Sequence, residues 1–584
     1  MIDIDLAPGK KGRLLVRCID CPRESLDAIQ SLLSTSYSPK HGGFFISISD
    51  YKNFGDLLCT INGVDEGEIT VEANDAVKNF YSEIERFKSL KKEEPQWELL
   101  DKIPGWKTKP YADQMQCIKF HIEKRRSLEG SETGIGKTLV LLYTFLYWKS
   151  MGTKRGLILC MNSGKLDWEK EVEQHTNLKA LTVGNGSQQI QYDINKFSSG
   201  NYDLLILHYD CLFQDSRSKI SIFDIIKKLS FDFVAIDEVH TLKNPSSKRH
   251  KRIVDLIENL GDIPLVCATG TAIDGNPRSA WAPLKIVCQR PNHYFPSYAE
   301  FSKYFVVREP RFFGKQKVMV DVGFKNLRRL REMVEPNMIR FLKSEVLDRP
   351  SKIFQNRIVQ LSGDQAKLYN EVKKQLKNEL ITQEGDTISL ANAATKLLRL
   401  RQILNHPLVI KDVKNYIGGS AKYNELDLIA EEILSHPNSQ LLVWTQWKAA
   451  VDLLVKRYKG YGSIAFYGGS DDRIVRDKVI SGKARVVIAI PEKAGTSVDF
   501  LKCIRTAVYL EKPWSLTLYR QSLDRIDRRA NTDPALIITI AAQQSVDGFV
   551  DAVLKKHQEV FDAVTLDEEK LIYLGKQELL KYLD

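Results

Sequence analysis

The chain has 584 residues, too many for one ordinary hydrophobic core, so we expect two to four domains. Its hydrophobic fraction of 43% and charged fraction of 27% are typical of a soluble globular protein, and no apolar run reaches the roughly 18 to 20 residues of a membrane span. The net charge of +11 is compatible with a nucleic-acid partner, although a basic excess of this size also serves solubility alone.

The N-terminus and the cysteines favour a reducing compartment. The first residues, MIDIDLAPGKKGR, lack the apolar core of a secretory signal. The nine cysteines are scattered and odd in number, which argues against a disulfide framework. Cys18 and Cys21 form one CxxC pair without a second pair or a histidine cluster nearby. We therefore expect a cytoplasmic protein of a bacterial or phage-infected cell, or a nuclear one in a eukaryote.

Residues 1–95 are predicted to form a small α+β domain. RLLVRCI at 13–19 and GFFISI at 43–48 have the composition of strands, and the segment between them has apolar residues at helical spacing. The charged stretch KSLKKEEP at 88–95 is the expected linker to the rest of the chain.

The remaining chain predicts an α/β fold, because short apolar strands alternate with amphipathic helices. One series of expected strands occupies 156–161, 203–209, 233–238 and 264–270. A second series occupies 440–446, 463–468, 484–490, 506–512 and 535–541. Between the two series, residues 366–404 are rich in Leu, Lys, Asn and Ala and are expected to form long helices. The pattern predicts two parallel sheets covered by helices.

SETGIGKT at 131–138 is a glycine-rich turn that ends in Lys-Thr and precedes the apolar run LVLLYTFLYW. Phosphate-binding loops have this form, because backbone N–H groups and a helix N-terminus then face the phosphates. The ε-ammonium of Lys137 would reach the β- and γ-phosphates of ATP, and the Thr138 hydroxyl would ligate Mg²⁺. The expected contacts to the nucleotide are Thr133, Gly134, Ile135, Gly136, Lys137 and Thr138. Taken alone, the segment also fits a glycine-rich helix-capping turn, since Ser131 stands where the strict pattern has Gly.

An acidic strand end lies about a hundred residues downstream of the loop. The strand FDFVAI ends in Asp237 and Glu238. Asp237 would complete the Mg²⁺ site, and Glu238 would orient and polarise the attacking water. Together with the loop, this pair predicts phosphoryl transfer, which needs positioning and charge stabilisation more than covalent chemistry.

The second α/β unit has no phosphate loop of its own but contains YRQSLDRIDRRA at 519–530. Gln521, Arg525 and Arg528 recur there at helical spacing. A solvated basic helix is one interpretation. The other is a set of arginines that reach across a cleft and stabilise charge on the transferred phosphoryl group. With this second interpretation the predicted catalytic residues are Lys137, Asp237, Glu238, Gln521, Arg525 and Arg528.

Between about residues 105 and 545 these motifs, in order, resemble the Swi/Snf-type branch of the superfamily-two helicase-like ATPases. PYADQ at 110–114 resembles the adenine-reading glutamine motif, with Gln114 as the base-contacting residue. Further similarities lie in DWEKE (167–171), ATGTAIDGNPRSAW (268–281), MIRFLKSEVL (338–347), LRLRQILNHP (398–407), LLVWTQW (441–447) and AGTSVDFL (494–501). The chain departs from the family pattern at Ala272, where proline is usual, and at Ser497 and Asp499, where Gly and Asn are typical.

The resemblance implies two RecA-like lobes with ATP and Mg²⁺ in the cleft between them and double-stranded or branched DNA across both. It divides the chain into an accessory or substrate-recognition domain (1–95), an ATP-binding lobe (96–345), a helical inter-lobe region (346–418) and a second lobe with C-terminal helices (419–584). The basic residues that follow the acidic strand end are either DNA contacts or a solvated face; they are Lys248, Arg249, Lys251 and Arg252.

Residues 37–61 resemble the HARP-type recognition module of fork-remodelling, strand-annealing members; a small domain that only docks on a lobe is the alternative. The resemblance thus favours a DNA-dependent ATPase that translocates on double-stranded or branched DNA, with fork regression, branch migration or strand annealing as its task. A motor that displaces proteins from DNA, of the RNA polymerase recycling kind, is a second hypothesis. A non-catalytic nucleic-acid clamp is a third, and the intact ATP-site residues speak against it.

Overall fold

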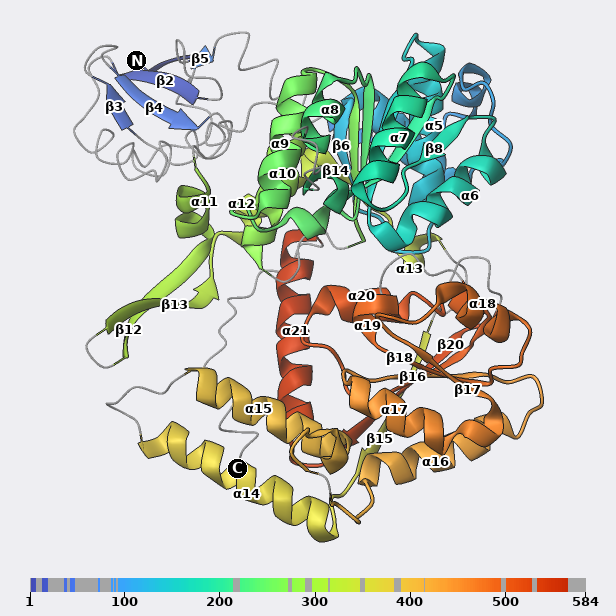
Figure 1. Cartoon of the computed structure of the whole chain (residues 1–584). Helices are drawn as coiled ribbons and strands as arrows, with labels where there is room; N and C mark the ends of the chain where they lie inside the picture. The colour runs from blue at the N-terminus through green and yellow to red at the C-terminus, as the bar shows by residue number, and fades with distance from the viewer. Residues whose placement is uncertain are drawn as a thin grey trace.

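The computed structural model describes residues 93–213, 221–270, 276–288, 297–313, 316–346, 352–382, 390–413, 415–494, 500–527 and 533–565, with short segments at 2–6, 13–18, 36–38, 43–47, 72–73, 86–87 and 89–90. Figure 1 shows a small N-terminal sheet, an upper lobe built around one parallel sheet, and a lower lobe built around another. The α/β fold with two parallel-sheet lobes, expected from the alternation of strands and helices, is confirmed.

The first lobe is built on a seven-stranded parallel sheet in the order β14-β6-β11-β10-β7-β9-β8. Its strands are β6 (Arg126–Glu129), β7 (Gly156–Cys160), β8 (Ala180–Thr182), β9 (Leu204–His208), β10 (Phe233–Asp237), β11 (Leu265–Ala268) and β14 (Met338–Ile339). The central strands are near-continuous apolar runs because helices cover both faces of the sheet. The helices are α4 (Ala112–Lys124), α5 (Lys137–Ser150), α6 (Lys165–His175), α7 (Ser187–Ser199), α8 (Ile222–Lys228), α9 (Lys248–Leu260) and α10 (Trp281–Val287).

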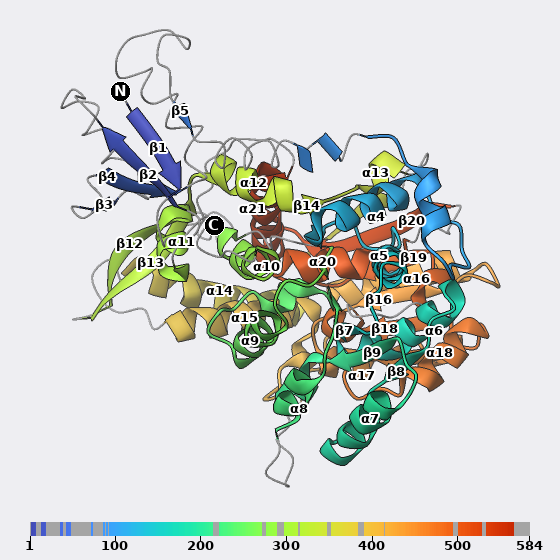
Figure 2. The ribbon, with the colours of Figure 1, turned by 90° about the horizontal axis from the view of Figure 1, so that it is seen from above.

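An insertion interrupts this lobe between α10 and β14. It consists of α11 (Tyr298–Phe305), the antiparallel hairpin β12 (Val306–Phe313) and β13 (Gln316–Phe324), and α12 (Leu327–Val334). The hairpin projects away from both sheets in two perpendicular views (Figures 1 and 2). The sequence analysis did not predict it, because it lies outside the regular alternation of strand and helix.

The second lobe is built on a six-stranded parallel sheet in the order β15-β20-β19-β16-β18-β17. Its strands are β15 (Lys352–Val359), β16 (Leu441–Trp444), β17 (Ser463–Phe466), β18 (Val486–Ala489), β19 (Thr506–Tyr509) and β20 (Ala535–Ala542). Around it lie α14 (Gly363–Thr382), α15 (Leu390–Asn405), α16 (Ala421–Leu434), α17 (Lys448–Arg457), α18 (Asp472–Ile480), α19 (Pro491–Ala494), α20 (Leu516–Leu523) and α21 (Val546–Thr565).

One expectation about the inter-lobe region is wrong. Residues 346–418 were expected to be helical, but β15 lies within them and pairs in parallel with β20 along its whole length. β15 is an edge strand on which Ile353, Phe354 and Ile358 are exposed, so its apolar residues do not form the continuous run that marks a buried strand. The long helices expected at 366–404 are present as α14 and α15. The domain boundaries otherwise stay predictions.

The N-terminal segments form a five-stranded sheet in the order β3-β4-β2-β1-β5. Its strands are β1 (Ile2–Leu6), β2 (Arg13–Cys18), β3 (Ser36–Ser38), β4 (Gly43–Ser47) and β5 (Glu72–Ala73). The two strands expected here are confirmed as β2 and β4, which pair antiparallel. The helix expected between them lies outside the described residues.

Helix α21 connects the two lobes by packing. It rises from the second lobe towards the first in Figure 1, and it contacts α12. Its buried residues Val550, Leu554 and Phe561 belong to the same apolar cluster as Leu330 and Met333 of α12. No described helix is long and apolar enough to cross a bilayer.

Candidate nucleotide site

The phosphate loop lies between the end of β6 and the start of α5. Gly134 and Gly136 have φ values of +89° and +98°, in the left-handed region that disfavours residues with a side chain. A Cβ on Gly136 would also lie 2.3 Å from the Gln114 Nε2 atom. The shape of the loop therefore requires glycine at both positions, as in a phosphate-binding loop.

The loop holds Lys137 and Gln114 through its own carbonyl groups. Lys137 Nζ donates to the Ser131 carbonyl at 3.0 Å. Gln114 Nε2 donates to the Ile135 carbonyl at 2.9 Å, and Gln114 Oε1 accepts from the Tyr111 N–H at 2.9 Å. The Gln114 amide thus holds the loop through the Ile135 carbonyl. Its contact with the adenine base stays a prediction.

Asp237 and Glu238 follow β10 and come within electrostatic reach of Lys137. Burial, followed by the charge of Glu238, raises the pKa of Asp237 to about 6. Burial alone would raise the pKa of Glu238 as well, but the hydrogen bond and charge of His240, with the charges of Lys137 and Arg525, lower it below its ordinary value. The lowered pKa keeps Glu238 ionised at neutral pH, which the predicted water-orienting role requires.

Two further side chains contact the carboxylates of this pair, and the sequence predicted a role for neither of them. Trp168 on α6 donates its Nε1–H to Asp237 Oδ2 at 2.9 Å. His240 Nδ1 lies 3.0 Å from Glu238 Oε2 and 3.2 Å from Thr269 Oγ1. Trp168 lies inside the DWEKE match and His240 two residues after Glu238, so their positions in the motifs were the available signal.

The second lobe contributes Gln521 and Arg525, both buried, at the C-terminal part of α20 and just beyond it. After His240 and Lys137, the Arg525 charge also contributes to lowering the pKa of Glu238, so the second lobe acts electrostatically on the first lobe's acidic pair. Arg528 lies outside the described residues, as do Ala272, Ser497 and Asp499. Gly270 is the last described residue before the gap that contains Ala272. It adjoins the phosphate loop, since a Cβ there would lie 2.5 Å from Thr133 Oγ1.

The Asn-His-Pro landmark at 405–407 has a structural explanation. Asn405 Nδ2 donates to Glu511 Oε1 and, at 3.2 Å, to Thr445 Oγ1, while the Tyr423 hydroxyl donates to Asn405 Oδ1 at 2.9 Å. Thr445 and Glu511 lie where β16 and β19 end. Asn405 thus solvates a buried carboxylate, Glu511, whose pKa burial raises above its ordinary value.

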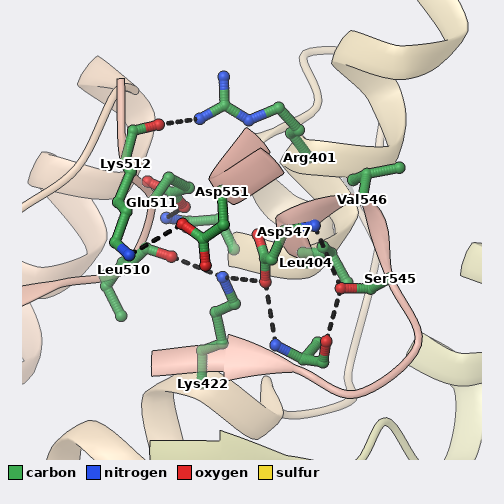
Figure 3. Close-up of polar contacts among 12 residues, drawn as sticks. Arg401, Leu404, Lys422, Leu510, Glu511, Lys512, Ser545, Val546, Asp547 and Asp551 are labelled. Carbon is green, nitrogen blue, oxygen red and sulfur yellow. Dashed lines mark hydrogen bonds and ion pairs between the residues drawn. The ribbon is translucent and has the colours of Figure 1, made fainter. Parts of the chain in front are cut away.

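Figure 3 shows the charged residues that surround this carboxylate and connect it to α21. Lys422 Nζ, fully buried, donates to the Leu510 carbonyl at 2.5 Å and pairs with Asp547 Oδ2 at 2.8 Å. Arg401 donates to the Lys512 carbonyl at 2.6 Å, and Lys512 Nζ pairs with Asp551 at 2.8 Å. The network holds the ends of β16 and β19 against α21.

The basic run on α9 divides into two kinds of residue. Arg249 pairs with Asp210 at 2.6 Å, and Arg252 donates to the Leu212 carbonyl at 2.5 Å, so both are used inside the lobe. Lys248 and Lys251 are exposed. Only these two lysines of the run therefore stay candidates for contacts to DNA phosphates.

The donor set near the loop fits Mg²⁺ bound with a nucleotide. The described residues contain no group of three or more His, Cys, Asp and Glu side chains that could hold a metal by themselves. Mg²⁺ takes one or two protein oxygens and completes its shell with phosphate oxygens and water. The Thr138 hydroxyl and the Asp237 carboxylate are the protein oxygens available for it.

A family model described as "SNF2-related domain" matches residues 113–409, just over half of the chain. The chain belongs to the SNF2-related domain family. The match runs from the buried glutamine beside the phosphate loop to the Asn-His-Pro landmark, so it includes the acidic pair and the linker between the lobes. The Swi/Snf-type resemblance is thereby confirmed.

Relatives in this SNF2-related family are distant in sequence. The chain is 22% identical to the chromatin structure-remodeling complex subunit snf21 of Schizosaccharomyces pombe, over 81% of this chain and 40% of that protein. It is 21% identical to the putative ATP-dependent helicase/translocase YwqA of Bacillus subtilis, over 77% and 47%. The chain therefore spans less than half the length of these two relatives. The expected enzyme class, an ATP hydrolase of helicase type, agrees with such names.

A solved structure, the Sulfolobus solfataricus SWI2/SNF2 ATPase core in complex with dsDNA, is 20% identical to the chain. It covers 79% of this chain and 94% of its own, with a TM-score of 0.36.

Proposed function

We propose that this SNF2-related chain hydrolyses ATP in a DNA-dependent manner and translocates on double-stranded or branched DNA. The observation that carries the proposal is a phosphate loop with left-handed Gly134 and Gly136 whose Lys137 acts on the acidic pair Asp237 and Glu238, while the second lobe supplies the buried Gln521 and Arg525. His240 first, and then Lys137 and Arg525, lower the pKa of Glu238, so charges from both lobes act on this carboxylate. Such a site responds to the relative position of the lobes, which is what a stepping motor requires.

In the proposed reaction the loop binds the phosphates and Lys137 neutralises charge on the transferred group. Thr138 and Asp237 would hold Mg²⁺, which would supply neutralisation of the phosphate charge when bound. Glu238, kept anionic and oriented by His240, accepts a hydrogen bond from the attacking water. Arg525 then stabilises the charge that develops as the bond to the leaving phosphate breaks.

DNA as the partner is supported by the net charge of +11, by the exposed pair Lys248 and Lys251, and by the helicase and translocase names among the relatives. Contacts to phosphates are independent of base sequence, and they weaken as salt rises because bound counterions are released. We therefore expect binding that depends strongly on ionic strength and little on sequence.

The test is ATPase activity measured without nucleic acid and with single-stranded DNA, duplex, forked and four-way DNA, and duplex RNA. Low turnover alone and strong stimulation by duplex or branched DNA are expected. DNA binding without turnover under every condition would leave a non-catalytic clamp. Turnover on plain duplex that removes a bound protein, with no preference for forks, would favour the protein-displacing motor.

For residues 1–95 we propose recognition of branched DNA. Every residue of the nucleotide site lies downstream of the expected linker, so removal of this domain should spare ATPase on plain duplex. The same deletion should remove branch migration or annealing on forks and four-way junctions. Unchanged junction activity would leave the domain as a docking element for a lobe.

A further inference from the structure

The segment between β14 and β15 is the covalent connection between the two lobes. It contains the one-turn helix α13 (Lys343–Val346), which lies between the lobes in Figure 1. This segment matched a family landmark in the sequence, but neither the nucleotide site nor the proposed reaction uses it. Its contacts reach both lobes at residues next to the site.

On the first-lobe side, the segment is hydrogen-bonded to the phosphate loop residue by residue. The Gly130 and Glu132 N–H groups donate to the Ile339 and Phe341 carbonyls at 2.8 and 3.0 Å. In the reverse direction, the Phe341 N–H donates to Ser131 Oγ at 3.1 Å and the Lys343 N–H to Glu132 Oε2 at 2.8 Å. The backbone of Lys343 is therefore tied to the loop through Glu132. Ser131, which departs from the strict glycine pattern, supplies one of these contacts.

On the second-lobe side, the buried Lys343 ammonium contacts Asp524 and Asp527, which precede and follow Arg525 in the sequence. Lys343 Nζ lies 2.9 Å from Asp524 Oδ1, 2.7 Å from the Asp527 carbonyl and 3.0 Å from Asp527 Oδ2. Its side chain is 2% exposed. Burial alone would raise the pKa of Asp524, but Lys343 and Lys352 hold it well below its usual range. One cation from the linker, Lys343, therefore contacts both of these aspartates, Asp524 and Asp527.

We propose that Lys343 is a positioning residue that couples the phosphate loop to Arg525, so that the arginine is aligned only when the linker is seated on the loop. The inference rests on the proposed ATPase function. Lys343 does not touch the nucleotide in this proposal. It acts by holding Asp524 and Asp527, and therefore the turn that contains Arg525, at a fixed place relative to the loop.

A second lysine provides a natural comparison. Lys352 Nζ lies 3.1 Å from Asp524 Oδ1 and 3.4 Å from Asp527 Oδ2, so it faces the same two carboxylates. However, Lys352 begins β15 and belongs to the second lobe's own sheet. Lys352 balances the carboxylate charge and is near the charge of Glu132, but among the described contacts no hydrogen bond joins it to the loop as the Lys343 N–H is joined. Lys343 and Lys352, together with Glu132 and Thr133 of the loop, line a cavity of about 550 Å³ where these elements meet.

The physical consequence of losing Lys343 follows from the charges. Asp524 would lose one of its two described lysine contacts and keep the other, to Lys352. Asp524 would then be free to pair with Arg525, its immediate neighbour, and that pairing would take the guanidinium away from the phosphate. Nucleotide binding should not change, because Lys137, Thr138 and Gln114 all belong to the first lobe.

The experiment compares K343M with K352M in the full-length protein, with DNA-stimulated kcat, KM for ATP and the affinity for a fluorescent ATP analogue as readouts. K343M should lower kcat by at least about tenfold, a fraction of the roughly 10³–10⁵ that an arginine finger supplies, with KM and analogue affinity within about twofold. K352M should lower kcat by less than about threefold, because it leaves the link to the loop intact.

The link can also be broken from its other end, which keeps the test valid if K343M does not fold. D524N should lower kcat with unchanged analogue affinity. The double variant K343M/D524N should be no slower than the slower single variant, because both changes remove the same contact. A K343R variant keeps the charge and should recover part of the lost kcat.

Equal losses in K343M and K352M would mean simple charge balance and would overturn the coupling. So would a K343M protein with parental kcat, or additive effects in the double variant. A parent protein without ATPase activity on any DNA would remove the proposed function itself and, with it, this inference. The two failures are distinct, since the first requires an active parent.

Discussion

The first and second lobes are both parallel sheets with polar residues at strand ends, but they support those residues by different means. In the first lobe, each predicted chemical group is held by a short contact to the loop or to a neighbouring motif: Lys137 by a loop carbonyl, Asp237 by Trp168, Glu238 by His240. In the second lobe, the charges at the ends of β16 and β19 are buried in a structural network, and the Arg525 charge contributes, after His240 and Lys137, to lowering the pKa of Glu238.

This difference indicates a division of labour. In the proposed site, all the residues that would bind ATP belong to the first lobe, so we expect binding to survive damage to the second lobe. We expect turnover to need both lobes, since Arg525, proposed to complete the site, belongs to the second. Single substitutions can separate these two requirements.

Glu238→Gln should reduce turnover to background while ATP binding stays near normal. The substitution removes the charge that orients water but keeps the size of the side chain and the loop contacts of the phosphates. ATPase assays and binding of a fluorescent ATP analogue measure the two effects, with Glu258→Gln on the exposed face of α9 as a matched control. Parental turnover in the variant would remove the role assigned to this carboxylate. Lys137→Ala, in contrast, should weaken binding itself.

Arg525→Ala should lower kcat by a large factor, within the roughly 10³–10⁵ range of arginine fingers, with little change in DNA affinity measured without nucleotide. The exposed Arg473 on α18 of the same lobe provides the control substitution. If DNA affinity falls while ATPase on saturating DNA stays normal, Arg525 contacts a DNA phosphate. The second lobe would then not supply the proposed charge for turnover through this residue.

Much of the first lobe could be predicted from sequence because its elements are local. Continuous apolar strands, a glycine-rich turn and an acidic strand end each carry their own signal within a few residues. What holds the site was harder to predict, since Trp168 meets Asp237 and Lys343 meets Asp524 only after folding. The edge strand β15 and the hairpin β12–β13 were missed for the related reason that neither shows a continuous buried run.

Asn405→Ala tests whether the landmark in the second lobe is structural. The change leaves the buried Glu511 carboxylate with fewer donors, which should cost roughly 1–3 kcal/mol of stability. A lower melting temperature is expected, with unchanged binding of the ATP analogue at a temperature where the variant is folded. Asn424→Ala, at an exposed position on α16, should have no comparable effect. Weakened ATP binding in the folded Asn405 variant would contradict a purely structural role.

The smallest expected effect concerns the two exposed lysines of α9. Replacing Lys248 and Lys251 with Ala should weaken binding of duplex DNA uniformly across sequences and leave ATP affinity unchanged. If each lysine neutralises one phosphate, the slope of log affinity against log salt should become shallower by roughly 0.9 for each residue removed. Lys196 and Lys228, exposed on α7 and α8, form the control pair, since they carry equal charge on other helices of the same lobe. An equal change in slope for both pairs would indicate a general effect of net charge, and the DNA path over this lobe would then have to be sought away from α9.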